Sequence, residues 1–317
     1  MTIHRFRRSI FLAGAASLTA LPAAAGAADP IVVNVGMVPL DIDGVVSYAQ
    51  DLGYYQAAGL DVRLTMLASG PAIANAVIGH SLDIGAANVG SIILARARGI
   101  PLKLIAPAGI AVNLEDTEPI DVRKDSPIRT GANLNGKTIG INAVKTLQHA
   151  AVLLWIDKHG GDSKTVRFIE MTVSEMPAAL DSGRVDAVLP GEPFTTMMRV
   201  NSRSLDSQYA SMKLPIPVFG IFSTDDWLAA HGDVAAKFVG AVRRAALYSN
   251  AHHNETAPML MRLTKVDSQL ATTMGRMAYG TNLDAATLQP IIDVLLQYGM
   301  LAKPIDANDV LWQGPSK

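Results

Sequence analysis

The chain has 317 residues, of which 49% are hydrophobic, and a formal net charge of −1 at pH 7. This length gives room for one large or two medium domains with a sizeable core, and the balanced charge gives no general footprint for nucleic acid or an anionic membrane. The sequence holds no cysteine, which excludes disulfides, thiolate metal sites, a thiol nucleophile and a lipid-modified N-terminal cysteine.

Residues 1–27 have the pattern of a secretory signal peptide. Arg5, Arg7 and Arg8 form a basic start, residues 10–21 are mainly apolar, and Ala25-Gly26-Ala27 matches an A-x-A cleavage site. The apolar segment is shorter than the roughly 20 residues that a membrane span needs. We expect cleavage after Ala27 and a periplasmic mature protein. The arginine pair leaves the general secretory and the twin-arginine export routes both open.

Strand and helix patterns alternate through the first part of the mature chain. Short apolar runs predict strands, and apolar spacings of three and four predict helices. The predicted order is a strand at 31–38, a helix at 44–58, a strand at 61–67, a helix from Pro71, a strand at 82–87 that leads into a helix, and a strand at 102–106. This order is typical of a parallel sheet covered by helices.

A charged, proline-containing segment at 115–130 interrupts the pattern and is interpreted as the first crossover to a second lobe. The second lobe is predicted to hold strands at 137–141, 166–171 and 185–189, with helices from Leu147 to about His159 and at 175–181. A strand at 218–222 returns to the first lobe, Asp233 is expected to cap a long helix, and helices are predicted at 267–279 and 285–298. We therefore expect a first lobe of residues 28–118 and 223–317, and a second lobe of residues 119–222 that includes the hinge crossovers.

Two stretches about a hundred residues apart share one internal spacing. The apolar pairs and the aspartate between Ala76 and Asp83 recur between Ala179 and Asp186. In each case the apolar run continues into a polar turn, at Asn88 in the first stretch and at Glu192 in the second. The repetition predicts two similar lobes with a ligand held between them.

Motif searches give no support for an enzyme, a metal or a nucleotide. Residues 131–138 satisfy G-x-x-x-x-G-K-[ST], but a phosphate loop must follow a strand and open a helix, and here the apolar, β-branched residues 138–141 predict a strand instead. His252 and His253 are adjacent and lack ligand spacing. No G-x-S-x-G or G-x-G-x-x-G occurs. No cofactor is expected.

Polar residues stand where predicted strands pass into loops or helices. These are Asp41, Ser69, Asn88, Asn113, Lys145, Thr146, Thr172 and Glu192. Because the carboxyl ends of parallel strands meet at one sheet edge beside helix N-termini, we expect this set to surround a cleft. Lys145 favours an anionic group, whereas Asp41 and Glu192 favour an amine or a ring N–H. For Ser69 and Asn88, helix capping is the structural alternative.

Four segments carry a family resemblance: 53–62 (GYYQAAGLDV), 69–85 (SGPAIANAVIGHSLDIG), 134–141 (LNGKTIGI) and 183–194 (GRVDAVLPGEPF). Together they are similar to the SsuA/THI5-like (NMT1-like) solute-binding proteins of ABC importers, which serve sulfonates, taurine, nitrate and pyrimidine precursors. The resemblance covers Ile31 to about Tyr298. It implies a type II periplasmic-binding-protein fold, with two doubly wound α/β lobes joined by a two-strand hinge that closes on the ligand.

The resemblance also implies which positions contact the ligand. By matching position they are Pro39, Leu40, Asp41, Ser69, Gly70, Asn88, Gly109, Ile110, Thr146, Leu147, Thr172, Gly191 and Glu192, and the strand-end pattern adds Lys145. We expect these residues to form the ligand-binding site.

The resulting hypothesis is a monomeric periplasmic receptor, not an enzyme. It would capture a small polar or anionic organic ligand and deliver it to an ABC permease and its ATPase in the inner membrane. Two alternatives stay open. One is a sensor that reports ligand occupancy to a membrane signalling partner. The other is a pyrimidine-synthase-like enzyme of the same fold, against which the missing cysteine-rich motif argues.

Overall fold

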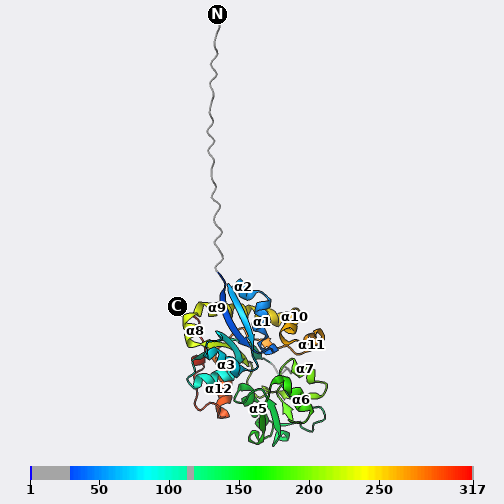
Figure 1. The fold of residues 1–317 in the computed structure, drawn as a ribbon. Coiled ribbons are helices and arrows are strands. Elements are labelled where there is room, and N and C mark those ends of the chain that lie inside the picture. The colour runs from blue at the N-terminus through cyan, green and yellow to red at the C-terminus, as the bar shows by residue number, and fades with distance from the viewer. Residues whose placement is uncertain (2–28, 113–117, 316–317) are drawn as a thin grey trace.

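The computed structural model describes Met1 and residues 29–112 and 118–315. Two five-stranded sheets, each flanked by helices, form two lobes that lie against each other (Figure 1). The expected signal peptide, apart from Met1, and Asn113 lie outside the described residues. Among the described helices, none has both the length and the apolar character that a membrane span requires.

The first sheet has the strand order β2-β1-β3-β12-β4. Its strands are β1 (Ile31–Met37), β2 (Leu60–Met66), β3 (Ile84–Asn88), β4 (Leu102–Pro107) and β12 (Phe219–Thr224). β1 pairs in parallel with β2 and β3, and β12 lies antiparallel between β3 and β4. The expected lobe boundary between residues 222 and 223 falls inside β12, so the chain has re-entered the first sheet by Phe219.

Helices from both ends of the chain cover the first sheet. They are α1 (Gly44–Asp51), α2 (Tyr54–Ala57), α3 (Gly70–Ile78), α4 (Val89–Ala97), α8 (Asp225–Ala230), α9 (Gly232–Ala251), α10 (His253–Thr264), α11 (Ser268–Thr273), α12 (Ala285–Gln297) and α13 (Ala307–Val310). The single helix predicted at 44–58 is divided at Gly53, whose φ of 70° leaves the helical region. The prediction that Asp233 caps α9 was wrong, because Asp233 lies in the first turn and His231 is the N-cap.

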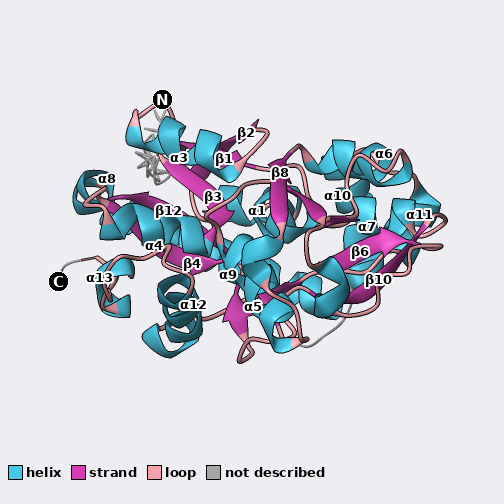
Figure 2. Ribbon diagram, turned by 90° about the horizontal axis from the view of Figure 1, so that it is seen from below, coloured by secondary structure: helices cyan, strands magenta, loops and turns pink. Residues whose placement is uncertain are grey.

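The second sheet has the strand order β10-β6-β9-β7-β8. Its strands are β6 (Pro119–Arg123), β7 (Thr138–Ile141), β8 (Arg167–Glu170), β9 (Ala187–Val188) and β10 (Ser202–Ser207), and its helices are α5 (Leu147–Lys158), α6 (Met176–Asp181) and α7 (Phe194–Met198). In Figure 2, β6, β10, α6 and α7 of this lobe lie on the right, with α5 and β8 nearer the centre of the view. The G-x-x-x-x-G-K-[ST] match runs from a 3₁₀ turn into β7, which confirms that it is not a phosphate loop.

A small antiparallel sheet joins β11 (Ile216–Pro217), β5 (Gly109–Ala111) and β13 (Ala278–Tyr279). The helix predicted at 267–279 is confirmed at its start, where Asp267 caps α11, but its predicted end was wrong, because α11 ends at Thr273 and the chain then becomes extended. The backbone N–H of Met277 and the hydroxyl of Tyr279 both bond to Asp41, at 2.6 and 3.0 Å. These tertiary bonds override the apolar spacing that favoured a helix.

The repeated spacing in the sequence corresponds to one repeated device. Asp83 stands just before β3 and accepts the backbone N–H of Asn34 at 2.7 Å. Asp186 stands just before β9 and accepts the backbone N–H of Thr138 at 2.9 Å. Asp83 therefore fastens β3 to β1, Asp186 fastens β9 to β7 in the same way, and the two lobes share this construction.

Candidate ligand-binding cleft

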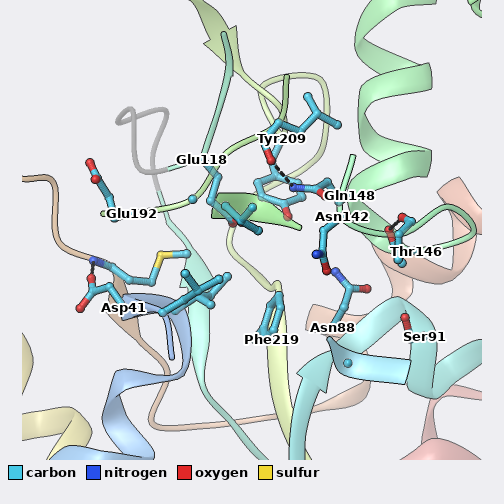
Figure 3. A pocket seen from close by; sticks show the side chains of 18 of the residues that line it. Asp41, Asn88, Ser91, Glu118, Asn142, Thr146, Gln148, Glu192, Tyr209 and Phe219 are labelled. Carbon is cyan, nitrogen blue, oxygen red and sulfur yellow. Dashed lines mark hydrogen bonds between the residues drawn. The ribbon is translucent and has the colours of Figure 1, made fainter. Parts of the chain in front are cut away.

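A cavity of about 760 Å³, which includes open solvent at its mouth, lies between the lobes (Figure 3). Its lining from the first lobe comprises Leu40, Asp41, Ile42, Gly70, Pro71, Asn88, Ser91, Phe219 and Met277, and the remaining lining residues are Glu118, Asn142, Ala143, Thr146, Gln148, Val173, Leu189, Gly191, Glu192 and Tyr209.

Asn88 joins the two lobes at this cavity. Its side-chain oxygen accepts the backbone N–H of Leu147, the first residue of α5, at 3.0 Å. Asn88 is also the N-cap residue of α4, but its side chain makes no capping bond there. Gly90 permits the same contact, since a Cβ at this position would lie 2.6 Å from the nitrogen of Leu147. The side chain of Asn88 therefore does not cap α4 but bonds the second lobe instead.

Asp41 is buried and has its bonding capacity filled by the protein. Its Oδ1 accepts from the hydroxyls of Tyr48 and Tyr279 and from Arg276, at 3.1, 3.0 and 3.4 Å. Its Oδ2 accepts the backbone N–H of Met277 at 2.6 Å. The carboxylate anchors the loop after β1 to the segment around β13, and it forms a buried ion pair with Arg276.

The carboxyl oxygens of Glu192 also accept hydrogen bonds from the protein. Its two oxygens accept the hydroxyl and the backbone N–H of Thr196, at 2.8 and 3.1 Å, in the first turns of α7. The carboxyl also bonds the backbone N–H of Gly275 from the first lobe. Burial raises the pKa of Glu192 to about 7, against the lowering effect of the Thr196 bonds.

Glu118 and Tyr209 form a buried polar pair that sequence reasoning missed. Both line the cavity, with exposed fractions of 8% and 2%. Glu118 Oε2 and the Tyr209 hydroxyl have no hydrogen-bond partner of ordinary geometry among the described residues. They are close enough to affect one another, and burial, as the main cause, raises the pKa of Glu118 to about 8 and that of Tyr209 well above its usual value.

The charged residues in the lining are all acidic. They are Asp41, Glu118 and Glu192, and no Lys, Arg or His occurs among the described residues that line the cavity. Lys145, which was expected to supply positive charge, is exposed and does not line it. Its backbone has a left-handed φ of 56°, and its N–H donates to His149 Nδ1 at 3.0 Å.

Half of the predicted site residues line the cavity: Leu40, Asp41, Gly70, Asn88, Thr146, Gly191 and Glu192. The others lie outside it: Pro39, Ser69, Gly109, Ile110, Lys145, Leu147 and Thr172. Thr172 caps a 3₁₀ turn together with Glu175, and Leu147 is fully buried. Ser69 is the N-cap of α3 without a side-chain capping bond.

A second cavity adjoins the first and shares Glu118, Tyr209 and Met277 with it. Ile110, His253 and Arg276 are among its other lining residues. In the part of the chain that the structure describes, no three His, Asp or Glu side chains cluster as metal ligands.

The family model described as NMT1/THI5 like matches residues 44–256. No curated protein matches the sequence.

Solved structures of similar fold are distant in sequence. The alkanesulfonate-binding protein SsuA from Xanthomonas axonopodis pv. citri, bound to MOPS, has a TM-score of 0.76 at 18% identity, covering 90% of this chain and 99% of that one. The ligand-binding component of an ABC-type import system from Staphylococcus aureus, with zinc bound, has a TM-score of 0.77 at 17% identity, covering 89% and 96%. The periplasmic nitrate-binding protein NrtA from Synechocystis PCC 6803 has a TM-score of 0.73 at 14% identity, covering 88% and 84%. The fold expected from the sequence, that of the periplasmic binding proteins, is confirmed.

Proposed function

We propose that this chain, which belongs to the NMT1/THI5-like family, is a solute-binding receptor of an ABC importer. It captures a small molecule between its two lobes and presents it to a permease and ATPase in the inner membrane. The similar solved structures include binding proteins for sulfonates and nitrate, which supports this role. The role is one of binding rather than catalysis.

One observation carries the proposal. The cavity is complete only when both lobes contribute, and the bond from Leu147 N–H to Asn88 Oδ1 closes it from one lobe to the other. A site divided in this way couples occupancy to the distance between the lobes. A transport receptor needs that coupling, because the permease must distinguish the loaded protein from the empty one.

The proposed motion turns the lobe that carries β6–β10 against the lobe that carries β1–β4 and β12. The proposed pivot includes the crossing between β10 and β12, which carries β11 of the small sheet. We further propose that the mature protein begins after Ala27, acts in the periplasm as a monomer and needs no cofactor.

The test is a binding and shape measurement on the mature chain. Protein made in an export-competent host is analysed by native mass spectrometry for a co-purifying molecule, stripped by unfolding and refolding, and then titrated with that molecule. We expect the melting temperature to rise by mass action, and the radius of gyration from X-ray scattering to fall on binding. A folded, stripped protein that binds no small molecule, or binds one without contracting, would contradict the proposal.

A further inference from the structure

The cleft contains one carboxyl that the protein leaves unsatisfied. Asp41 and Glu192 are held by their own lobes or by the opposite one, through the bonds described above. Glu118 differs, because its buried Oε2 has no hydrogen bond of ordinary geometry among the described residues; the side chains of Tyr209 and Gln208 lie near the carboxyl and lower its pKa, and the group lies on the cavity wall. A buried polar atom without a partner costs free energy, and a ligand that donates a hydrogen bond to it would remove that cost.

The surroundings of Glu118 favour a positive charge. Tyr209 and Phe219 contribute aromatic rings to the same cavity, and Figure 3 places Tyr209 beside Glu118 with Phe219 below them. Aromatic faces attract cations, and more strongly when both are removed from water. Leu40, Ile42 and other apolar side chains complete the wall and suit a hydrocarbon body.

The same surroundings disfavour an anion. The cavity has carboxyl groups and no basic side chain in its described lining. Arg276 lines the second cavity and is already bonded to Asp41, to the Tyr48 hydroxyl and to Thr256. A sulfonate or a nitrate would therefore enter a space with no free cation to balance it.

We propose, on the basis of the receptor function proposed above, that the ligand of the cleft is a small organic ammonium ion. Its charged nitrogen donates to the Glu118 carboxylate, and its apolar body packs against Tyr209 and Phe219. Glu118 is then the residue that sets the charge specificity of the receptor.

Binding of an ammonium ion should release a proton. In the empty cleft, burial raises the pKa of Glu118 to about 8, so the carboxyl is mostly protonated at neutral pH. The ammonium ion pairs with the carboxylate, and the displaced proton passes to the buffer. The other titratable groups on the two cavities are Asp41, Glu192, Tyr209, His253 and Arg276. Comparing proton release in the wild type and in a Glu118 variant distinguishes the proton of Glu118 from protons released by these groups.

The experiment compares compounds that share a skeleton and differ in charge. Butyl, cyclohexyl and benzyl skeletons are each offered as the ammonium, the neutral carboxamide and the sulfonate to stripped wild-type protein. Melting temperature identifies binders, and isothermal calorimetry gives affinities. We expect the binders to be ammonium compounds, with about one proton released per binding event near pH 7, measured in buffers of different ionisation enthalpy.

Two variants connect the result to Glu118. Glu118→Gln keeps the shape and removes the charge, so we expect the affinity for the best ammonium compound to fall about tenfold or more and the proton release to fall with it. Glu255→Gln is the matched control, because Glu255 is exposed on α10 and lines neither of these cavities. It should leave both quantities unchanged.

The possible failures are distinct. If sulfonates or carboxamides bind best, or if Glu118→Gln binds the ammonium compounds as well as the wild type does, the charge specificity is overturned and the receptor function stands. If no compound of any charge binds and no molecule co-purifies, the receptor function fails and this inference fails with it.

Discussion

Asn88 and Leu147, 59 residues apart in sequence, are joined by a 3.0 Å hydrogen bond that crosses from one lobe to the other. Asn88 ends β3 and Leu147 begins α5, so the bond links a strand end of the first lobe to a helix N-terminus of the second. A backbone N–H in the first turn of a helix has no partner within that helix. Asn88 supplies one only when the lobes are together, which makes the bond a feature of the closed molecule.

Removing the side chain of Asn88 should therefore weaken closure more than folding. For Asn88→Ala we expect ligand affinity to fall by about fivefold to tenfold, the cost of about one hydrogen bond. The free energy of unfolding of the empty protein should change by less than about 1 kcal/mol, because the side chain does not cap α4. Calorimetric titration and urea unfolding measure the two quantities.

Asn88→Asp provides the rescue, since it keeps an acceptor oxygen in the same place. It should retain more of the affinity than Asn88→Ala does. If Asn88→Ala chiefly destabilises the fold and leaves affinity intact, the bond has no role in closure.

Gly90 offers a second test of closure, through steric contact. A Cβ at this position would lie 2.6 Å from the nitrogen and 2.9 Å from the Cβ of Leu147, too close for the lobes to meet. In Gly90→Ala we expect the lobes to stay apart, with a larger radius of gyration in the presence of ligand and an affinity reduced about tenfold or more. Small-angle scattering and calorimetry measure these effects.

The matched control is Gly240→Ala in α9, where an added Cβ meets no atom within 4 Å. This variant should bind normally and be more stable by about 0.5–1 kcal/mol, because alanine favours a helix interior. A Gly90→Ala protein that contracts and binds like the wild type would show that the interlobe contact is not needed.

Local patterns in the sequence were sufficient to place Asn88. The apolar run before it and the glycine and apolar run after it define a strand, a turn and a helix, and each is set within a few residues. The same kind of pattern failed for Lys145. Lys145 is exposed and has a left-handed backbone conformation at φ 56°, which a non-glycine residue rarely adopts and which no short motif here signals.

Glu118 and Tyr209 were missed for a different reason. They lie where the chain crosses between lobes, immediately before β6 and shortly after β10. Their place on the cavity wall depends on how the lobes pack, and segments 91 residues apart carry no shared local pattern. The sequence predicted that Asp41 would lie at the cleft. Three of the four groups that bond its carboxylate belong to residues 276–279. Only the fold shows that these bonds leave the carboxylate without free acceptor capacity.

The aspartates of the repeated spacing should stabilise their lobes independently of binding. Asp83→Ala and Asp186→Ala each remove the acceptor for a backbone N–H at a strand junction. We expect each to lower the free energy of unfolding by about 1–3 kcal/mol, measured by urea denaturation. Asp61→Ala is the control, because its partner Arg63 lies on the surface and such pairs contribute about 0–1 kcal/mol. If Asp61→Ala and Asp83→Ala lower the free energy of unfolding equally, the bond at the strand junction does not stabilise the lobe.

The buried carboxyls predict how the stability of the protein, with its lobes closed as in this structure, depends on pH. Burial raises the pKa of Asp43 and of Glu192 to about 7 and that of Glu118 to about 8, from ordinary values of 3.8 and 4.5. Between the ordinary and the raised pKa the folded state holds a proton that the unfolded state has released. The unfolded state then binds fewer protons, so the free energy of unfolding falls as pH rises.

His149 acts in the opposite direction, since burial lowers its pKa from 6.5 to about 4. Its folded form stays neutral while the unfolded form is protonated, so between these values it makes stability rise with pH. Below about pH 6.5 the effects of the carboxyls and of His149 on the free energy of unfolding oppose each other. Above about pH 6.5 only the carboxyls change it.

We therefore expect the protein in the closed form of this structure to lose stability from about pH 6.5 to about pH 8. Each carboxyl contributes up to about 1.4 kcal/mol per pH unit where its protonation differs fully between the two states. Glu118→Gln should flatten the decline between about pH 7 and 8, because Asp43 and Glu192 have by then largely ionised. Urea unfolding at a series of pH values measures this. Glu255→Gln should keep the wild-type slope, and a stability that rises over this interval would mean that these carboxyls are ionised in the empty cleft.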